Sequence, residues 1–479
     1  MNDCSKEIVT VPNFWDEERC RSFIAAAEIR GIVPAAPDYP PHYRNNDRQV
    51  LDDEKLADSM FNAVKKHLPS ILVDDQGRQW KPVGVNSRFR LCRYRSGQFF
   101  GRHRDGVFHV GLGRQTMLSL LVYLNGTENF SGGRTRFFST RTVQETTSSI
   151  VPKDGLLALF PHELWHDGEP LDHGTKYVLR SDVIFECVDP SEVFSASGHG
   201  HQGYVWQALA LDNRRFMTGG RDRRIVLWEL DLDNLPKLAK ETSPQLQSVT
   251  CLVKLNSDVV VAGSRDRSLA LVNIGSFSSK RLPNAHAAAI TQLAPISEEQ
   301  FASACAGGVI SIRDADGQVI RTWRAHEHWI WGLVTNEDRL VSVAEDGVIA
   351  AWNKVDGSQL TAHRFLQRTP SVLAQGSDGT FAVGFLDGGI EVGRLGKYWE
   401  PFARWQAHTG AVRTIAWVAG TWISGGEDYA VRLHDLGRDV SETLIEGKDF
   451  VRNITPVGGQ IIVVGYNGGI RRIIRNVRS

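Results

Sequence analysis

The stretch SVAEDGVIAAW, Ser342–Trp352, joins a short apolar run, an acidic turn and a second run of alternating apolar residues. Variants of it occur six more times in the C-terminal half of the chain. Successive turns are 44, 41, 39, 41, 41 and 39 residues apart. The residues at the centre of the seven turns are Asp222, Asp266, Gly307, Asp346, Asp387, Asp428 and Asn467.

A period near 40 residues with strand–turn–strand content predicts the blades of a β-propeller rather than a helical array. The alternation on both sides of each turn predicts short strands. Four copies also carry a histidine about twenty residues before the turn: His201, His286, His326 and His408. Where the turn aspartate is kept, a His–Asp contact would satisfy two partly buried polar groups. We therefore interpret these histidines as structural and not as metal ligands.

Over about residues 192–477 these copies resemble the WD-repeat family, although the tryptophan after the turn is kept only as Trp228 and Trp352. The resemblance implies a seven-bladed β-propeller that holds a protein substrate or partner. A closed ring of this kind usually needs a strand from one end of the domain to complete a blade at the other end. We predict that Glu192–Ser197 supplies that strand.

The N-terminal part, residues 1–190, has no such repeat. It begins with two amphipathic helix patterns, at residues 15–31 and 52–68, and Gly31 is a stop signal for the first. Beyond Lys81 short β patterns follow one another between turns rich in Gly, Asn and Pro. About eight strands behind two helices predict a jelly roll with a helical buttress. The expected fold is mainly β, with domains at 1–190 and 191–479.

The overall composition narrows the function classes. The chain has 479 residues, and its 55 basic residues balance 55 acidic ones, which argues against a general nucleic-acid or membrane-surface binder. It contains no apolar run near the length of a membrane span and no apolar stretch at its start that would resemble an export signal. Six scattered cysteines without a CxxC pair indicate reduced thiols in a cytoplasmic protein.

Candidate metal ligands occur in two places in the N-terminal part. His103 and Asp105 stand one residue apart in GRHRDG, a spacing that chance produces about once in such a chain. His162 and His166 follow the apolar run LLALF. Two imidazoles and one carboxylate can occupy one face of an octahedral metal and leave three positions open, as in non-haem Fe(II) oxygenases.

A basic residue that could bind a 2-oxo acid follows ten residues after His166. Lys176 begins the apolar run KYVLRSDVIF, and period-2 alternation puts Val178, Arg180 and Asp182 on its face of the predicted strand. A co-substrate that chelates the metal through its 2-oxo acid group would need a cation for its far carboxylate. A lysine or arginine on this face supplies that charge-assisted contact.

At these residues the chain resembles the 2-oxoglutarate/Fe(II) dioxygenases, and within them the prolyl 4-hydroxylase-like domain. The resemblance covers nearly all of residues 8–187. The pieces that carry it stand in the family's order: LCRYRSGQFFGRHRDG, LVYLNG, FSGGRTRFF, VPKDGLLALF and HDGEPLDHGTKYVLRSDVIF. It implies a hydroxylase that uses Fe(2+) and 2-oxoglutarate, with ascorbate as an accessory reductant.

The resemblance also assigns residues to roles. His103, Asp105 and His166 match the iron ligands, and His162 is the alternative to His166, disfavoured because HDGEP begins at His166. Lys176 matches the base that anchors 2-oxoglutarate. Arg180 is the alternative anchor; otherwise it lines the pocket or pairs with Asp182. Two tyrosines match residues that line the co-substrate pocket, Tyr94 and Tyr123.

Arginines around this site leave two interpretations open. Six of them lie between Arg88 and Arg104. They either steer an anionic substrate or pair with carboxylates on the sheet. The segment RNNDR, residues 44–48, is a candidate for the substrate-side wall of the pocket.

The predicted function is hydroxylation of a C–H bond, of a prolyl or other protein side chain, with the propeller docking the substrate or a partner. Three alternatives remain: a WD-repeat scaffold with a vestigial oxygenase domain, a dioxygenase that acts on a small molecule, and a metal-binding jelly roll with non-oxidative chemistry. A vestigial domain would be free to lose a ligand or the anchoring base, and the chain keeps all four.

Overall fold

The computed structural model describes residues 7–35, 43–74, 77–111, 113–140, 143–188, 200–336, 339–376, 379–436, 441–447, 449–466 and 468–474. The chain divides into two compact units, Met1–Ala196 and Ser197–Ser479. The predicted boundary between residues 190 and 191 lies outside the described ranges and stays a prediction. Within those ranges, no helix is both long and apolar enough to cross a membrane.

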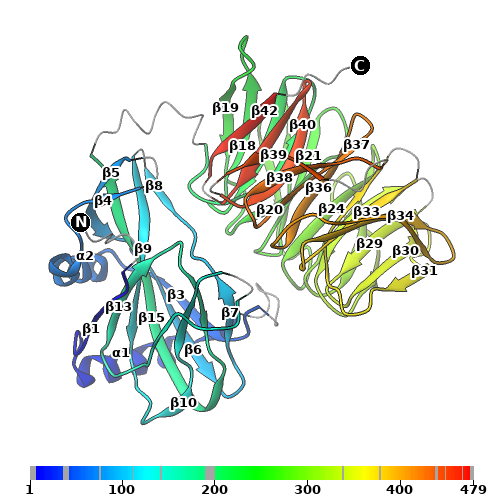
Figure 1. Cartoon of the computed structure of the whole chain (residues 1–479). Helices are drawn as coiled ribbons and strands as arrows, with labels where there is room; N and C mark the ends of the chain where they lie inside the picture. Colours follow the sequence, from blue (N-terminus) through cyan, green and yellow to red (C-terminus); the bar gives the residue numbers. More distant parts are fainter. Residues whose placement is uncertain are drawn as a thin grey trace. The chain divides into compact units, whose positions relative to one another are not determined.

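The N-terminal unit contains a large antiparallel sheet (Figure 1). Its main path is β1 (Val9–Val11), β13 (Leu157–Pro161), β9 (Arg114–Tyr123), β15 (Leu171–Cys187), β6 (Arg88–Arg95), β3 (Asp47–Asp52) and β2 (Val33–Pro34). Four further strands pair beside this path: β4 (Leu72–Val73), β5 (Gln79–Val85), β8 (His109–Gly111) and β10 (Phe130–Gly132).

A smaller sheet completes the jelly roll. Its order is β12 (Ser148–Ile150), β11 (Thr135–Phe138), β14 (Trp165–Gly168) and β7 (Phe100–His103). The alternation of β9 separates two cores: Leu121 and Tyr123 pack with Phe137 of the smaller sheet, whereas Leu120 and Val122 pack on the opposite face. The space between the two sheets is therefore the inside of the roll.

Two helices cover the outer face of the large sheet, as the sequence predicts. Helix α1 (Glu17–Arg30) begins after Asp16, whose carboxylate accepts a 2.7 Å hydrogen bond from the Arg19 N–H. It ends at Gly31, whose φ of 89° favours glycine. Helix α2 (Glu54–Val64) continues into the 3-10 turn η2 (Lys65–His67). Cys20, Ala27 and Met60 are among the helical residues in the apolar core between the helices and the large sheet.

The strand count differs from the expectation. The described residues of this unit contain fifteen strands, β1 to β15, where about eight were predicted. The difference has a physical reason. Several of the extra strands are only two or three residues long, and a pattern of that length carries no readable alternation.

The C-terminal unit consists of six four-stranded antiparallel sheets and a seventh with three described strands (Figure 1). The first four sheets are β16 (Val205–Ala210), β17 (Arg215–Gly220), β18 (Ile225–Leu230), β19 (Pro236–Thr242); β20 (Val249–Lys254), β21 (Val259–Ser264), β22 (Leu269–Asn273), β23 (Ser279–Leu282); β24 (Ile290–Ser297), β25 (Gln300–Cys305), β26 (Val309–Asp314), β27 (Val319–Arg324); and β28 (Ile330–Asn336), β29 (Arg339–Ala344), β30 (Val348–Asn353), β31 (Gln359–Arg364).

The remaining sheets continue in the same order of strands. They are β32 (Pro370–Gln375), β33 (Phe381–Phe385), β34 (Gly389–Leu395), β35 (Trp399–Gln406); β36 (Val412–Val418), β37 (Thr421–Gly426), β38 (Ala430–His434), β39 (Ser441–Glu446); and β40 (Val451–Val457), β41 (Gln460–Gly465), β42 (Ile470–Ile474). Each predicted turn residue in the described ranges lies between the second and third strands of its sheet.

The last sheet joins the first, so the ring is closed. Asn453 of β40 accepts a 3.0 Å hydrogen bond from the Ala208 N–H of β16, and the Thr455 hydroxyl donates to the Ala208 carbonyl at 2.7 Å. Trp228 and Ile470 share one apolar cluster across this junction. The seven-bladed propeller is therefore present. The predicted closing strand, Glu192–Ser197, lies outside the described residues.

Three blades hold a buried polar chain that begins at a predicted histidine. His326 contacts Asp346 through Nδ1 at 3.0 Å and the Ser342 hydroxyl through Nε2 at 2.7 Å, and the indole of Trp352 donates to the same hydroxyl at 2.8 Å. The same His–Asp and His–hydroxyl contacts form around His201 and His408, where the third side chain on the hydroxyl is Trp228 in the first case and His434 in the second. The ring of His286 lies 2.8 Å from the Ser303 hydroxyl, and Gly307 stands where those three blades have the aspartate. The structural role predicted for these histidines is confirmed.

Removing one carboxylate from such a chain is expected to destabilise the propeller. Asp346→Ala leaves the buried His326 without its partner, which costs about 1–3 kcal/mol of unfolding free energy. The matched control is Asp387→Ala, whose side chain is 49% exposed and pairs with Arg368, so its loss costs less than about 1 kcal/mol. Denaturant unfolding of the full chain measures both. Equal losses would contradict a special role for the buried chain.

Candidate active site

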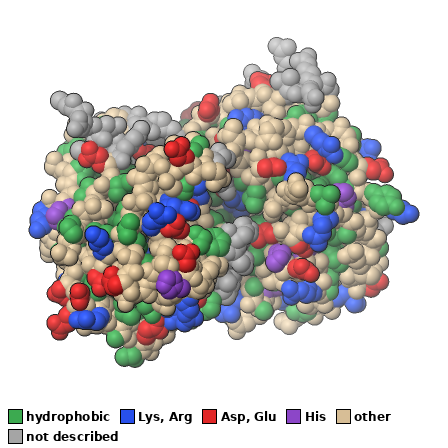
Figure 2. Space-filling model, turned by 60° about the horizontal axis from the view of Figure 1, so that its bottom comes forward, with side chains coloured by type: hydrophobic (Ala, Val, Ile, Leu, Met, Phe, Trp, Pro, Cys, Tyr) green, Lys and Arg blue, Asp and Glu red, His purple; other side chains and the backbone are tan. Residues whose placement is uncertain are grey.

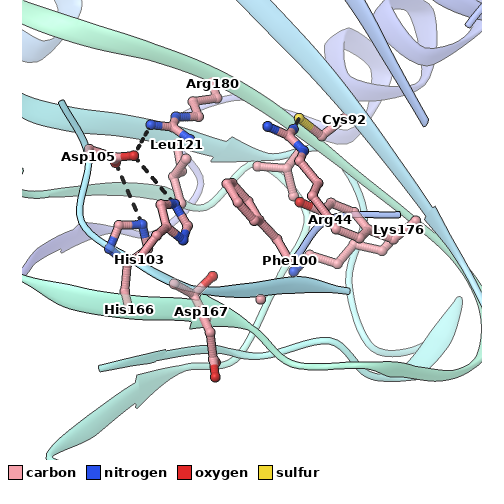
Figure 3. A pocket seen from close by; sticks show the side chains of 14 residues that line it. Arg44, Cys92, Phe100, His103, Asp105, Leu121, His166, Asp167, Lys176 and Arg180 are labelled. Carbon is pink, nitrogen blue, oxygen red and sulfur yellow. Dashed lines mark hydrogen bonds and ion pairs between the residues drawn. The ribbon is translucent and has the colours of Figure 1, made fainter. Parts of the chain in front are cut away.

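His103, Asp105 and His166 meet between the two sheets of the jelly roll (Figure 3). His103 ends β7 and lies opposite His166 of β14 in the register of the smaller sheet. The Nε2 atoms of His103 and His166 lie 3.5 and 3.6 Å from the Asp105 carboxylate oxygens. One ligand atom from each residue lies within 4.8 Å of the other two. The three predicted ligands therefore form one cluster.

Backbone carbonyls orient both imidazoles. The Nδ1 of His103 lies 2.8 Å from the Gly101 carbonyl, and the Nδ1 of His166 lies 2.9 Å from the Leu164 carbonyl. A carbonyl only accepts, so each Nδ1 carries the proton and each Nε2 presents a lone pair to the cluster. Among the described residues the buried Nε2 of His103 has no hydrogen-bond partner. Two lone pairs and a carboxylate that face one another fit a cation, so the donor set fits a divalent metal of the Fe(II) type.

The charges of the cluster also suit metal binding. Burial would raise the pKa of Asp105, but Arg180 and the two imidazoles outweigh burial and hold that pKa well below its usual value. Burial, and then His103, lowers the pKa of His166 to about 3. At neutral pH the carboxylate is therefore ionised and His166 is neutral, the forms in which they bind metal.

His162, the alternative ligand, lies beside the cluster and makes other bonds. Its Nδ1 lies 2.9 Å from the Ser119 hydroxyl, and its Nε2 lies 3.0 Å from the Thr116 hydroxyl. The Ser119 hydroxyl also donates to Asp105. His162 therefore supports Asp105 through the Ser119 hydroxyl, and its ring nitrogens do not face the other ligand atoms.

One cavity contains this cluster and Lys176. It encloses about 470 Å³ of empty space, including its mouth. Its lining residues are Arg44, Cys92, Tyr94, Phe100, His103, Asp105, Leu121, Thr135, His166, Asp167, Gly168, Lys176, Val178 and Arg180. The shared face predicted for β15 is present, since Lys176, Val178 and Arg180 all line the cavity.

Lys176 is a buried cation whose contacts are neutral. Its ammonium donates to the Gly133 carbonyl and lies 5.4 Å from the ring centroids of both Tyr94 and Tyr123. Burial lowers its pKa to about 8. Among the described residues no carboxylate forms an ion pair with it. A buried ammonium without a counter-ion is costly, which indicates a site for an anionic ligand.

Gly133 holds the carbonyl that Lys176 uses. Its φ of 69° lies in the left-handed region, and a Cβ there would lie 2.7 Å from a methyl carbon of Leu171. The turn GGRTRF therefore needs glycine at this position. Tyr123 does not line the cavity. Its hydroxyl lies 2.7 Å from the hydroxyl of Thr135, and Thr135 does line the cavity.

Arg180 pairs with the ligand Asp105, not with Asp182 as one interpretation of the sequence had it. Asp182 instead has Arg90 as its ion-pair partner at 3.7 Å. Burial would lower the pKa of Arg180, but Asp105 and Asp182 raise it. Arg180 thus lies at the metal end of the cavity and Lys176 at the other end (Figure 3).

Some residues in or beside the cavity were not singled out in the sequence. Of the lining residues, Phe100 stacks its ring on His103 with centroids 3.8 Å apart, and Asp167 pairs with Arg136 at 2.8 Å instead of joining the metal cluster. Ser119, which is not among the lining residues, donates a hydrogen bond to Asp105. Ser119 had a usable signal, because it is a polar residue inside the apolar run MLSLLVYL. Phe100 had none.

Most of the six arginines pair with carboxylates of the fold. Arg88 pairs with Asp52, Arg90 with Asp182, Arg95 with Asp47, and Arg93 with both Glu28 and Asp47. Arg102 and Arg104 instead lie over the rings of Phe138 and Trp165. Arg44 of RNNDR reaches the cavity, where it donates to the Cys92 sulfur at 3.2 Å.

The structure thus contains a jelly-roll domain with a His–Asp–His cluster and, after it in the chain, a seven-bladed propeller. Residues 89–181 match the model of the 2OG-Fe(II) oxygenase superfamily, and residues 192–229 match that of the WD domain, G-beta repeat. The chain therefore carries a 2OG-Fe(II) oxygenase domain followed by a WD-repeat propeller. The first match contains all three residues of the metal cluster as well as Lys176 and Arg180.

Two of the proteins that are similar to parts of the chain illustrate the likeness. One is the nuclear distribution protein nudF of Emericella nidulans, 24% identical over 190 residues, which cover 34% of this chain and 42% of nudF. The chain thus spans less than half the length of that relative. The other is the WD40 β-propeller domain of Doa1, with a TM-score of 0.51 and 18% identity over 57% of this chain and 93% of that one. This second likeness shows the propeller fold alone.

Metal affinity should separate the ligands from His162. His103→Ala removes a lone pair from the cluster and should weaken Mn(II) binding about a hundredfold or more, since outer partners alone are worth about 10–100-fold. His162→Asn, the matched control, should weaken it no more than about tenfold, the low end of that range, because His162 reaches Asp105 only through the Ser119 hydroxyl. Calorimetric titration of the full chain with Mn(II) measures both. The assignment of His166 over His162 fails if the control loses as much affinity as His166→Ala.

Proposed function

We propose that the N-terminal domain is an Fe(II)- and 2-oxoglutarate-dependent dioxygenase that hydroxylates a C–H bond. The observation that supports this most is a single cavity with a His–Asp–His cluster at one end and a buried ammonium without a counter-ion at the other. A dicarboxylate that chelates a metal at one end and meets a cation at the other fits those two ends.

Each chain residue then has a defined task. His103, Asp105 and His166 hold Fe(2+), and Lys176 binds the far carboxylate of 2-oxoglutarate. Arg180 keeps Asp105 ionised and oriented, while Tyr94 and Tyr123 shield Lys176 from water. Bound there, Fe(2+) and 2-oxoglutarate would activate dioxygen. One oxygen atom of dioxygen would enter the substrate C–H bond as a hydroxyl group, and the other would enter the succinate formed from 2-oxoglutarate with loss of carbon dioxide.

The substrate that we propose is a protein side chain, prolyl or another residue. The support is the propeller, a fold that commonly serves protein interactions, on the same chain as the oxygenase domain. We further propose that ascorbate maintains the iron in its reduced state and that the protein works in the cytoplasm. The five described cysteines are buried thiols, which agrees with a reducing compartment.

The test is turnover of 2-oxoglutarate under Fe(II), ascorbate and oxygen. The wild-type chain should convert it to succinate, and Asp105→Ala should not. Proteins incubated with the enzyme are then searched by mass spectrometry for a gain of one oxygen atom. Turnover with a free amino acid but with no protein would contradict the protein-substrate proposal. No turnover at all would favour the scaffold or the non-oxidative alternatives.

Binding of 2-oxoglutarate should weaken as pH rises. Lys176 has a depressed pKa of about 8, so it is charged below pH 8 and neutral above it. The Kd should therefore rise by up to about tenfold per pH unit above 8. Binding to the Mn(II) form, measured without oxygen between pH 6.5 and 9.5, gives this profile.

The variant Lys176→Met supplies the control for the pH profile. It should bind 2-oxoglutarate about 10–100-fold more weakly at pH 7, because a hydrogen bond to a charged group contributes about 1.5–3 kcal/mol. Its Kd should not change between pH 7 and 9. A variant that kept the wild-type pH dependence would exclude Lys176 as the anchor and favour Arg180.

A further inference from the structure

The inner strand of every propeller blade contains a bulge near its start. In each of the seven strands the pairing register skips one residue: Trp206, Thr250, Thr291, Trp331, Ser371, Arg413 and Arg452. Because the skipped residue holds the same position in every blade, these seven residues form a ring at one end of the inner strands. A bulge residue is unpaired in the ladder, so strand pairing does not restrict which side chain stands at this position.

A second ring lies at the same end. It contains the residue after the second strand of each blade: Arg221, Arg265, Ala306, Glu345, Leu386, Glu427 and Tyr466. Six of them donate a backbone hydrogen bond to a residue just before the inner strand; for Arg221 the acceptor is the Tyr204 carbonyl, at 2.7 Å. The two rings together surround this end of the propeller.

The charges on these two rings are distributed unevenly. The fourteen positions carry four arginines and two glutamates. Glu427 accepts from Arg413 at 2.8 Å, and Glu345 accepts from the Trp331 indole at 2.7 Å. The other three arginines, Arg452, Arg221 and Arg265, belong to the seventh, first and second blades. Those blades are neighbours in the closed ring, so three of the four arginines of the two rings lie in one sector.

At the centre of the sector, two guanidinium groups meet one indole. The guanidinium carbon (Cζ) of Arg265 lies 5.0 Å from the Trp206 ring centroid, and that of Arg452 lies 5.3 Å from it. Arg452 donates to the Arg413 carbonyl at 3.1 Å, and among the described residues it has no carboxylate at ion-pair distance. Burial, then its neighbours Arg413 and Arg265, lowers its pKa to about 10. We call Trp206, Arg265 and Arg452 the arginine–tryptophan cluster.

Half-buried aromatic rings adjoin the cluster. Tyr204 stacks on Tyr466 with centroids 4.3 Å apart and lies 5.9 Å from Trp206. Tyr466 also meets Phe450 edge-on at 4.8 Å. Tyrosine, tryptophan and arginine are the residues that contribute most to protein interfaces. The rings offer an apolar surface that a bare inorganic anion cannot use.

We propose that this end of the propeller binds a protein segment through an aspartate or glutamate side chain. Arg452 is the main cation for the carboxylate, Arg265 and Arg221 add to the field, and residues next to the acid pack on Tyr204, Trp206 and Tyr466. Three arginines in one sector suit one or two carboxylates, whereas a nucleic acid would need an extended basic surface. The inference deepens the partner role proposed for the propeller and needs neither iron nor 2-oxoglutarate.

The test uses the full chain without metal and fluorescent nine-residue peptide pools with a fixed central residue. Pools with central glutamate should bind at least tenfold more tightly than pools with central glutamine, and the preference should shrink as salt rises from 50 to 500 mM. Arg452→Met, which keeps an apolar stem, should lose at least tenfold for the glutamate pool. Arg321→Ala on the outer strand β27 is the control and should bind like the wild type.

Three results would overturn the proposal. They are equal binding of the glutamate and glutamine pools, wild-type binding by Arg452→Met, and tighter binding of a central phosphoserine pool, which would make the occupant a phosphorylated segment. Arg265→Glu reverses one charge of the cluster, so this variant should bind pools with central lysine more tightly than pools with central glutamate. A purely structural role of Arg265 would not predict such a reversal. Thermal unfolding confirms that each variant is folded. Turnover of 2-oxoglutarate by the same variants reports separately on the oxygenase proposal.

Discussion

Two imidazoles and a carboxylate converge inside the jelly roll, and much of the N-terminal domain holds them there. The strand register sets His103 opposite His166, two backbone carbonyls turn both lone pairs inward, and Ser119 and Arg180 support the carboxylate. The fold thus directs three donor groups at one point. A metal that binds this arrangement would stabilise the folded domain.

Figure 2 shows acidic and basic side chains interspersed over the face it presents, in keeping with the zero net charge of the chain. Within the described residues, the oxygenase cavity and the arginine–tryptophan cluster of the propeller are two places where cationic side chains gather. Both places put arginine or lysine where burial disfavours a cation, as the lowered pKa values of Lys176 and Arg452 indicate. Local charge of this kind marks functional sites more reliably than overall composition does.

Much of the architecture could be predicted from the sequence, because a pattern that recurs in seven copies can be recognised even where single copies depart from it. The period near 40 residues predicted the propeller. The resemblance to the 2-oxoglutarate/Fe(II) dioxygenases, carried by the stretches around His103 and Lys176, predicted residues that the structure brings together in one cavity. Contacts that depend on strand register were not predictable. Arg180 and Asp105 are 75 residues apart, and Trp206 meets Arg452 only because the ring closes.

The length of β15 has a consequence for the co-substrate. Lys176 and Arg180 stand on one unbroken strand, four residues apart, so their Cα atoms are about 13 Å from each other. Hydrogen bonds to neighbouring strands on both sides prevent that distance from changing. On the proposed function, a ligand must reach from the metal beside Arg180 to the ammonium of Lys176. The strand thus fixes the length of the ligand that can bind both ends of the cavity. A 2-oxo diacid one carbon shorter would leave one of its two ends unbound.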